Sequence, residues 1–151
     1  MGFYVKMNKL DLKKYWESEE QIAKIKGWDF SYIADRYKSY ESDLLWDYEQ
    51  IVRLYLKEDN KLLDIDTGGG EVLLKFNHPY NLTTVTEGYS PNVKLCRATL
   101  GEKGIRVVEM TDYSNMPFED NEFDIVINRH GAYNVDELYR ILKPGGMFIG
   151  I

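Results

Sequence analysis

Three consecutive glycines interrupt the apolar stretch LLDIDTGGGEVLL, and they are Gly68, Gly69 and Gly70. Glycine carries no side chain, so a ligand can approach the backbone N–H groups of such a turn and hydrogen-bond to them. Asp64 and Asp66 stand just before the turn and offer carboxylates to a charged group of that ligand. These residues predict a ligand site, although a tight connection between a strand and a helix would have a similar composition.

Two further acids follow later strand-like segments. Glu87 ends the segment LTTVTE, 19 residues after Gly68, and an acid at this spacing can bind both hydroxyls of a ribose. Asp112 follows the segment IRVVEM and could accept a hydrogen bond from an adenine amino group. Taken singly, either acid could be an ordinary solvated residue of a turn. Because the carboxyl ends of parallel strands meet at one edge of a sheet, the acids and the glycines together indicate a ligand that contains adenosine.

Short apolar strands alternate with helical stretches after about residue 60. The expected strands cover 61–66, 82–87, 105–110, 123–128 and 147–151. The expected helices cover 69–76, 91–101 or 91–104 with Ser90 as its N-cap, and 134–143 with Asn134 as its cap. This alternation predicts an α/β fold with a doubly wound parallel sheet in the spatial order 3-2-1-4-5. The residues expected to be buried in that sheet are Leu63, Ile65, Val85, Val107, Val126, Ile127 and Phe148.

The composition limits the classes of partner. The chain has 151 residues, 44% of them hydrophobic, which suffices for one core. A net charge of −6 disfavours nucleic acid as a partner. Cys96 is the only cysteine, so neither a disulfide framework nor a cysteine-based metal site is expected. Because the N-terminal stretch has no apolar segment of signal-peptide or membrane-span length, we expect a cytoplasmic protein without membrane or metal partners.

The sequence also narrows the kind of adenosine ligand. A dinucleotide fingerprint that starts at Gly68 would need glycine at position 73, which is Leu73, and no phosphate-binding G-x-x-x-x-G-K-[ST] loop is present. A ligand without phosphates therefore fits better. The pieces LLDIDTGGGE, TVTEGYSP, DYSNMPFEDNEFDIVI and LYRILKPGGMFIGI occur in the order and spacing typical of one family. Over about 90 residues from Leu62, the chain resembles class I S-adenosylmethionine-dependent methyltransferases of the small-molecule type.

The resemblance implies S-adenosyl-L-methionine as the cofactor, held by a Rossmann-like core. The cofactor-binding residues that it implies are Asp64, Asp66, Gly68, Gly69, Gly70, Glu87, Gly88, Tyr89, Asp112, Tyr113 and Asn128. In this family pattern the glycine turn would cradle the methionine part and Glu87 would hold the ribose. Asp112 and the Tyr113 backbone N–H would bind the adenine, and Asn128 would face the methionine or the sulfonium. Asp64 would orient the loop or reach the amino group through water.

Asp66 departs from the family pattern. The glycine loop of the family usually reads G-x-G-x-G, and Asp66 occupies its first glycine. Its carboxylate could pair with the ammonium group of the ligand or repel the ligand's carboxylate. An alternative function therefore stays open, a catalytically weak domain that binds the cofactor or a partner. A nucleotide-binding oxidoreductase is a third possibility, which Leu73 disfavours.

The reaction itself requires little of the protein, because the sulfonium activates its own methyl group and the enzyme mainly aligns the acceptor. A general base is needed only for a poorly nucleophilic acceptor. His130 is then the candidate catalytic residue, although it could equally be a structural residue of a turn. Arg129 could bind an acidic substrate or simply face solvent. No D/N-P-P-Y/F segment indicates a nucleobase acceptor, so a small molecule is expected.

The N-terminal part is helical in pattern and rich in aromatic residues. Helices are expected over 11–26, 30–40 and 46–57. Residues 1–58 would form a helical cap or lid, and residues 59–151 the cofactor-binding core. Aromatic residues of such a cap usually belong to its own packing, but some can line the acceptor pocket. The candidates are Tyr32, Tyr37 and Trp46.

The resemblance also bears on the last strand. Relatives continue past the fifth strand with a helix and two more strands, so this chain is expected to be truncated. A fifth strand without its second neighbour exposes unpaired N–H and C=O groups. We therefore expect a homodimer, formed through the fifth strand or through exchanged N-terminal helices.

Overall fold

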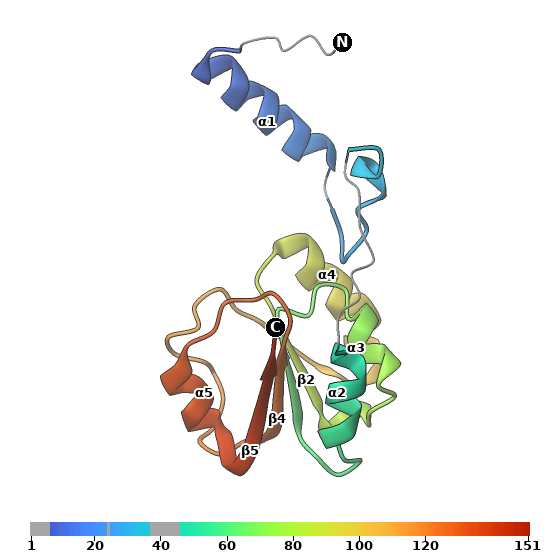
Figure 1. Ribbon diagram of the computed structural model, residues 1–151, viewed down its shortest axis with the longest axis vertical. Coiled ribbons are helices and arrows are strands. Elements are labelled where there is room, and N and C mark those ends of the chain that lie inside the picture. The colour runs from blue at the N-terminus through green and yellow to red at the C-terminus, as the bar shows by residue number, and fades with distance from the viewer. Residues whose placement is uncertain (1–6, 24, 37–45) are drawn as a thin grey trace. The chain divides into compact units, whose positions relative to one another are not determined.

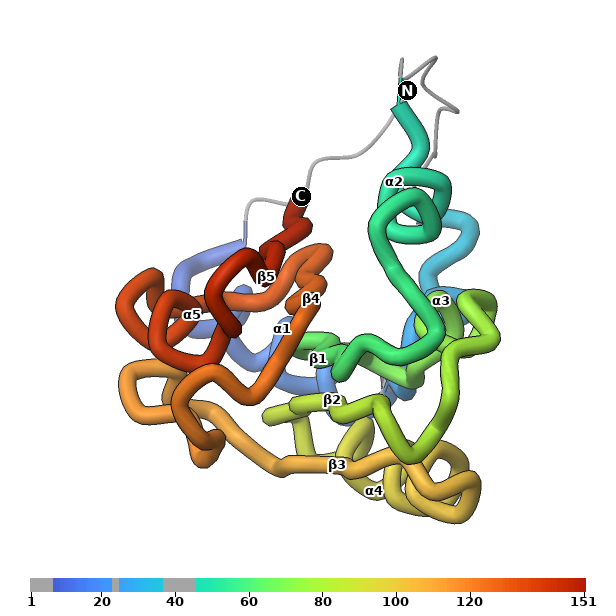
Figure 2. Tube along the Cα trace, turned by 90° about the horizontal axis from the view of Figure 1, so that it is seen from below, coloured from blue at the N-terminus to red at the C-terminus, as the bar shows by residue number. Residues whose placement is uncertain are grey.

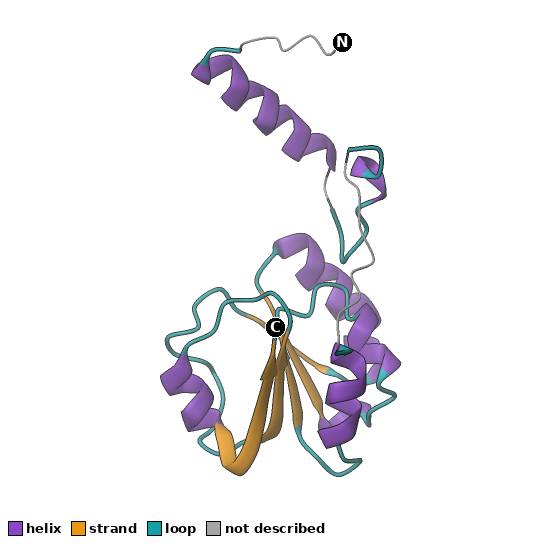
Figure 3. Ribbon diagram, in the orientation of Figure 1, coloured by secondary structure: helices purple, strands orange, loops and turns teal. Residues whose placement is uncertain are grey.

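The computed structural model describes residues 7–23, 25–36 and 46–151 of the chain. Figure 1 shows the elements in chain order, and Figure 3 distinguishes helix, strand and loop. The described residues form two compact units: one contains 7–23, 25 and 29–36, and the other contains 26–28 and 46–151. All the predicted cofactor-binding residues belong to the second unit.

The first unit begins with helix α1, Lys9–Ala23. Asn8 caps its first turn, because the side-chain oxygen accepts the N–H groups of Leu10 and Asp11 at 3.0 and 2.9 Å. The helix predicted over 11–26 is thus present, and it starts earlier because Asn8 supplies a cap that was not recognised in the sequence.

The helix predicted over 30–40 is different in the described residues. A single 3-10 turn covers Ser31–Ile33, and a hydrogen-bonded turn follows it up to residue 36. The prediction was wrong for this stretch because the Asp29 side chain accepts the Ser31 N–H at 3.0 Å and holds a local turn in place of a regular helix.

Among the residues that the structure describes, the second unit contains a five-stranded sheet. The strands are β1 Leu62–Ile65, β2 Thr83–Glu87, β3 Arg106–Glu109, β4 Phe123–Asn128 and β5 Leu142–Gly150. Their spatial order is β3-β2-β1-β4-β5, and every neighbouring pair is parallel (Figure 2). The predicted fold class and strand order are confirmed.

Helices cover both faces of this sheet. They are α2 Tyr48–Tyr55, α3 Glu71–Lys75, α4 Ser90–Thr99 and α5 Val135–Ile141. Side chains of α2, α3 and α4 form one hydrophobic cluster with the strands. Helix α5 and the segment 110–118 form a second cluster with the strands. Figure 2 shows α5 on one side of the sheet and α2 and α3 on the other. Burial between these layers supplies the main stabilisation of the unit.

The predicted core is mostly confirmed. The fully buried members are Leu63, Ile65, Val85, Val126 and Ile127. Val107 and Phe148 are only partly buried, so their predicted full burial was wrong. Both lie on the two outer strands, β3 and β5, each of which pairs with one neighbour in the described structure. An outer strand has less cover from neighbouring side chains than a central one.

Local hydrogen bonds set the ends of two helices. Asn134 caps α5 as predicted, and its side chain accepts the Glu137 N–H at 3.0 Å. Helix α4 begins differently, because Tyr89 and not Ser90 is its N-cap. The Tyr89 carbonyl accepts the first helical bonds, including that of the Val93 N–H at 2.9 Å. The predicted cap was therefore one residue too late.

Strand β5 is longer than predicted. It was expected over 147–151, after a turn at PGG, but it covers Leu142–Gly150. The segment before Met147 follows β4 with an irregular register between Phe123 and Ile125. Gly145, at φ +82°, permits this irregularity because glycine tolerates a left-handed backbone.

Arg140 of α5 fastens the loop that leads into β4. Its guanidinium donates to the carbonyl oxygens of Met116 and Phe118 at 2.9 and 2.7 Å. It also pairs with the carboxylates of Glu137 at 2.7 Å and Asp120 at 3.0 Å. The hydrogen bond from Arg140 is the main reason that the pKa of Glu137 falls to about 2. One side chain thus connects the loop before β4 to helix α5.

We predict that Arg140→Ala lowers the free energy of unfolding by about 2–3 kcal/mol, because two carbonyls and two carboxylates lose a charged donor. Arg97→Ala is the matched control, since Arg97 and Glu109 form an ion pair in which both side chains are at least half exposed. The Arg97→Ala control should lower the free energy of unfolding by less than about 1 kcal/mol. Urea denaturation of both variants measures the two values, and equal losses would contradict the structural role of Arg140.

Candidate cofactor site

The glycine turn lies at the carboxyl end of β1, and left-handed backbone shapes it. The φ angle is +52° at Asp66, +69° at Gly68 and +82° at Gly70. Glycine adopts such angles without strain, and aspartate is one of the few other residues enriched there. An aspartate can therefore stand at the first position of this turn without distorting the backbone.

The N–H groups of the turn have partners within the chain. The Gly68 N–H donates to the Glu87 carboxylate at 2.9 Å, and the Gly69 N–H donates to the Glu71 carboxylate at 3.2 Å. Both N–H groups thus already have an acceptor within the protein. A ligand that bonds to them must share or replace an acceptor that the protein itself supplies.

Glu87, at the end of β2, is the centre of a hydrogen-bond network. One carboxylate oxygen accepts the N–H groups of Gly88 and Tyr89, both at 2.9 Å. The other accepts the Gly68 N–H at 2.9 Å and the Asn92 side-chain amide at 3.3 Å. Because Glu87 is only 5% exposed, these donors replace the water that a carboxylate would otherwise bind. The network ties β1, β2 and α4 together at the predicted ribose position.

Asp64, on β1, is buried beside the turn. The Thr67 hydroxyl donates to its carboxylate at 2.6 Å. Burial raises the pKa of Asp64 to about 7, while the Thr67 bond and the positive charge of Arg129 oppose that rise. The charges of Asp66 and Glu87 raise it further. This carboxyl therefore changes charge near neutral pH, and a nearby cation would favour its ionised form.

Asp66 is half-buried and contacts two later loops. The Tyr113 hydroxyl donates to its carboxylate, and its own N–H donates to the Thr86 hydroxyl at 3.1 Å. A Cβ atom added to Gly131 would lie 2.7 Å from the Asp66 Cβ, so the two backbones approach closely. Burial raises the pKa of Asp66, and the bond from Tyr113 opposes that shift. Tyr113 thus lies on the loop that is predicted to bind the adenine, and its side chain also contacts the glycine turn.

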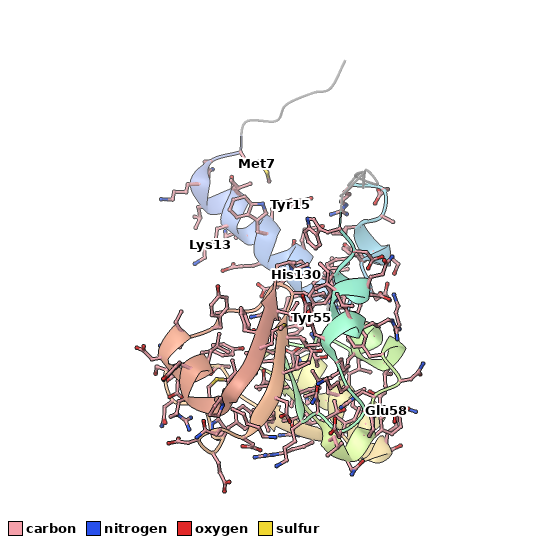
Figure 4. All side chains as sticks on the ribbon, turned by 60° about the horizontal axis from the view of Figure 1, so that its bottom comes forward. Met7, Lys13, Tyr15, Tyr55, Glu58 and His130 are labelled. Carbon is pink, nitrogen blue, oxygen red and sulfur yellow. The ribbon has the colours of Figure 1, made fainter. Side chains whose placement is uncertain are left out.

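The turn after β4 brings three predicted residues together. The Asn128 side-chain NH₂ group donates to the Gly131 carbonyl oxygen at 2.9 Å, and the Asn128 side-chain oxygen accepts the Gly131 N–H at 2.8 Å. These two bonds shape the turn. The guanidinium carbon of Arg129 lies 5.0 Å from the centre of the Trp28 ring. The His130 ring meets Trp28 edge-on, also at 5.0 Å. His130 is exposed beyond the carboxyl end of β4 (Figure 4).

Trp28 is a site residue that the sequence analysis missed. Its backbone N–H donates to the Glu71 carboxylate at 3.3 Å, and the backbone N–H of the preceding Gly27 donates to the Asn92 side chain at 2.7 Å. A Cβ atom added to Gly68 would lie 2.7 Å from the indole nitrogen of Trp28. The indole therefore covers part of the glycine turn. The available signal was Gly27 directly before a tryptophan, where the helical pattern breaks.

Tyr48, on α2, is a second residue that was missed. Its ring belongs to the core, and its hydroxyl is the one buried side-chain polar atom without a hydrogen-bond partner among the described residues. Burial raises the pKa of this phenol, the Asp64 charge adds to the rise, and Arg129 opposes it. Tyr48 also lines a small recess. Its lining consists of Tyr48, Asp64, Ile65, Asp66, Thr67, Val72, Leu73, Ile127 and Arg129. Nothing in the sequence distinguished Tyr48 from other core residues of an amphipathic helix.

The remaining predicted cofactor residues lie on the loops after β2 and β3. Asp112 is exposed, and its carboxylate accepts the N–H and hydroxyl groups of Ser114 at 2.8 and 2.7 Å. These bonds lower its pKa. Gly88 has no room for a side chain, because an added Cβ would lie 2.7 Å from the Met110 carbonyl oxygen. Tyr89 is half exposed at the start of α4.

The three predicted acceptor-pocket residues have different outcomes. Tyr32 belongs to the first unit, where the Arg36 guanidinium lies 5.3 Å from the centre of its ring. Trp46 is exposed immediately before α2. Tyr37 lies outside the described residues. A role for them in substrate binding therefore stays a prediction.

Residues 63–150 match the family described as "Methyltransferase domain". This match covers more than half of the chain and contains the whole glycine turn and the ends of β2 and β4. The chain belongs to this methyltransferase family. The resemblance to class I S-adenosylmethionine-dependent methyltransferases is thereby confirmed, and S-adenosyl-L-methionine is the cofactor that the family implies.

Two relatives and one solved structure illustrate the similarity of this family member to known proteins. The demethylmenaquinone methyltransferase of Staphylococcus saprophyticus is 32% identical over 74% of this chain and 52% of its own length. That of Thermus thermophilus is 29% identical over 80% of this chain and 62% of its own length. The chain thus spans little more than half the length of these curated relatives.

The solved structure is an S-adenosylmethionine-dependent methyltransferase from Mesorhizobium loti. It matches with a TM-score of 0.54 at 17% identity, over 69% of this chain and 53% of the other. At that identity the comparison supports the fold. Within the described ranges, no helix is both long and apolar enough to cross a membrane.

We predict that the pH dependence of stability contains a contribution from Asp64. The pKa of Asp64 is about 7 in the folded protein, whereas its ordinary value is 3.8. Between these two pH values the folded state therefore keeps a proton that the unfolded state has lost. Stability from this group is full below about pH 4 and falls as the pH rises to about 7. Asparagine does not titrate, so the Asp64→Asn variant does not lose this stability as the pH rises.

The measurement is urea denaturation of wild type and Asp64→Asn between pH 4 and pH 8. The difference in unfolding free energy should move in favour of the variant by on the order of 2–4 kcal/mol across that range. Asp59→Asn, which replaces an exposed carboxylate, serves as the control. A difference that stays constant with pH would show that Asp64 is ionised throughout.

Proposed function

We propose that the second unit binds S-adenosyl-L-methionine and that the protein transfers its methyl group to a small-molecule acceptor. The observation that carries the proposal is the junction of the glycine turn with the buried Glu87 carboxylate at the carboxyl ends of β1 and β2. This junction lies at the edge where open parallel sheets bind their ligands. The family to which the chain belongs supports the same reaction.

The residues at this edge fit the cofactor. Glu87 would bind the ribose hydroxyls, and its bond to Asn92 is the longest of its contacts at 3.3 Å. A ribose hydroxyl can replace that donor while the three shorter bonds to backbone N–H groups stay in place. Asp112 and the Tyr113 backbone would receive the adenine, and the glycine turn would lie along the methionine part.

The cofactor supplies a methyl group on a sulfonium, and the chain's own residues supply alignment. Trp28 covers part of the turn and would keep water from that part. His130 is exposed next to Trp28 and is the candidate to take a proton from an acceptor that must be deprotonated. Its role depends on the acceptor, for which the names of the quinone-methylating relatives suggest an aromatic small molecule.

A second candidate is a weak cofactor- or partner-binding domain. One observation favours it: Gly68 and Glu87 are already bonded to each other, so a ligand must compete with the protein's own contact. The two candidates differ in turnover but agree in binding. Turnover with demethylmenaquinone analogues, measured as S-adenosylhomocysteine formed, would support the first.

Thermal shift is the direct test of binding. A ligand that binds the folded state raises the melting temperature. We expect S-adenosylhomocysteine to raise it and NAD to leave it unchanged. A shift with NAD alone would support a nucleotide-dependent oxidoreductase, and no shift with either ligand would contradict the proposed function.

We predict that Glu87→Ala weakens S-adenosylhomocysteine binding by roughly 1.5–3 kcal/mol, because the charged hydrogen bond from the ribose is lost. The control is Glu109→Ala, because Glu109 occupies the paired position on β3 and is exposed. Calorimetry gives both affinities, after circular dichroism has verified that each variant is folded. Unchanged affinity of Glu87→Ala would refute the ribose role.

A further inference from the structure

Asp66 stands where the family pattern has a glycine, and its side chain has a defined place in the structure. The backbone at Asp66 has a φ angle of +52°, which aspartate tolerates better than most residues. Its N–H donates to the Thr86 hydroxyl at 3.1 Å, so the residue is fixed to the end of β2. The residue is half-buried, and a carboxylate that has lost part of its water requires donors from the protein.

The donor to this carboxylate is the Tyr113 hydroxyl. Tyr113 lies in the loop after β3, and its ring packs against the hydrophobic cluster that contains α5 and the segment 110–118. In the sheet, β2 stands between β3 and β1. The hydrogen bond from Tyr113 to Asp66 therefore joins the loops of two strands that are not neighbours.

The Asp66 side chain also packs against the turn after β4. A Cβ atom added to Gly131 would lie 2.5 Å from a carboxylate oxygen of Asp66 and 2.7 Å from its Cβ. The carboxylate thus occupies space that only a glycine at position 131 leaves free. Confined between this backbone and the Tyr113 hydroxyl, the Asp66 side chain offers its acceptor oxygen in one place.

The loop that carries Tyr113 has few other attachments. The N–H groups of Met110 and Met116 anchor its two ends, at 3.0 Å to a carbonyl oxygen of β2 and at 2.7 Å to a carboxylate of α5. Between these anchors, residues 111–115 make one hydrogen bond to another part of the described chain, and it is the bond from Tyr113 to Asp66. This bond therefore sets the position of the middle of the loop relative to the glycine turn.

Asp112 lies in the middle of the same loop, directly before Tyr113. Its carboxylate accepts the N–H and hydroxyl groups of Ser114 at 2.8 and 2.7 Å. Both bonds are internal to the loop, so they orient the carboxylate within the loop and do not fix it relative to the sheet. The place at which Asp112 offers an acceptor to a ligand thus depends on the bond between Tyr113 and Asp66.

We propose that Asp66, acting through Tyr113, is a positioning residue for the loop after β3 and determines how strongly the site prefers adenine to a base without an amino group. The proposal rests on the proposed function, in which Asp112 accepts the adenine amino group. A site discriminates best when the group that reads the ligand is held in place by its neighbours. The aspartate at the first position of the glycine turn then acts on the ligand's base from a distance.

The test compares two ligands that differ only in the base. S-adenosylhomocysteine carries adenine, and S-inosylhomocysteine carries hypoxanthine, in which an oxygen replaces the amino group. The ribose and the amino-acid part are the same in both ligands. Effects of a substitution on those parts therefore cancel in the ratio of the two affinities, and the ratio reports on the base. Isothermal calorimetry measures both affinities for each variant.

We expect Tyr113→Phe and Asp66→Gly each to reduce the preference for S-adenosylhomocysteine about 3–10-fold, because each removes one partner of the bond. Phenylalanine keeps the ring in its cluster, and glycine adopts a φ angle of +52° without strain. The double variant should lose no more than the single variants, since both break the same contact. Asp66→Asn should keep most of the preference, because its amide oxygen also accepts from a hydroxyl.

Tyr139→Phe is the matched control, since Tyr139 lies on α5 and is 86% exposed. It should leave both affinities unchanged. Circular dichroism verifies that every variant is folded. A merely structural role of the bond would weaken both ligands equally and leave their affinity ratio as it is in the wild type.

An unchanged ratio in Tyr113→Phe and Asp66→Gly would therefore overturn the positioning role, and so would additive losses in the double variant. Tighter binding of both ligands to Asp66→Gly at an unchanged ratio would overturn it too, and would identify the carboxylate as an obstacle in the site. If the wild type binds neither ligand, the proposed function fails and the positioning role fails with it. If the wild type binds S-adenosylhomocysteine and the variants keep its ratio, the positioning role alone fails.

Discussion

The buried carboxylate of Glu87 is the contact on which the site depends. Its oxygens accept the N–H groups of Gly68, Gly88 and Tyr89, which belong to the ends of β1 and β2 and the start of α4. A carboxylate removed from water requires such donors, and these backbone groups require an acceptor. Each therefore fixes the other, and the candidate ligand-binding edge of the sheet is held in shape by the protein's own contacts.

The same edge concentrates negative charge. Asp64, Asp66 and Glu87 lie within interaction distance of one another, and burial raises the pKa of the first two. Such a cluster is costly in the free protein, and hydroxyl donors and the charge of Arg129 offset part of that cost. A cationic ligand lowers the cost further, so the electrostatics favour a positively charged cofactor such as a sulfonium that carries an ammonium group.

Aromatic side chains complete the site from outside the sheet. Trp28 covers the glycine turn, with the Arg129 guanidinium over its ring and the His130 ring edge-on to it, while Tyr48 belongs to α2. Trp28 and Tyr48 come from segments that precede the family's signature pieces in sequence. These aromatic contacts are additions to the parallel sheet and its glycine turn. We expect the selectivity of the site for its ligand to depend on them.

The sequence by itself determined the strand order, most of the core and the positions of Asp64, Glu87 and the glycine turn. These follow from periodicity and from the rule that the ends of parallel strands meet, which local patterns encode. Only the tertiary structure decided that Glu87 bonds to the Gly68 N–H, that Trp28 covers the turn, and that the buried Tyr48 hydroxyl has no hydrogen-bond partner among the described residues. Such pairings join residues 19 or more positions apart, so their geometry depends on how whole elements pack and no local pattern records it.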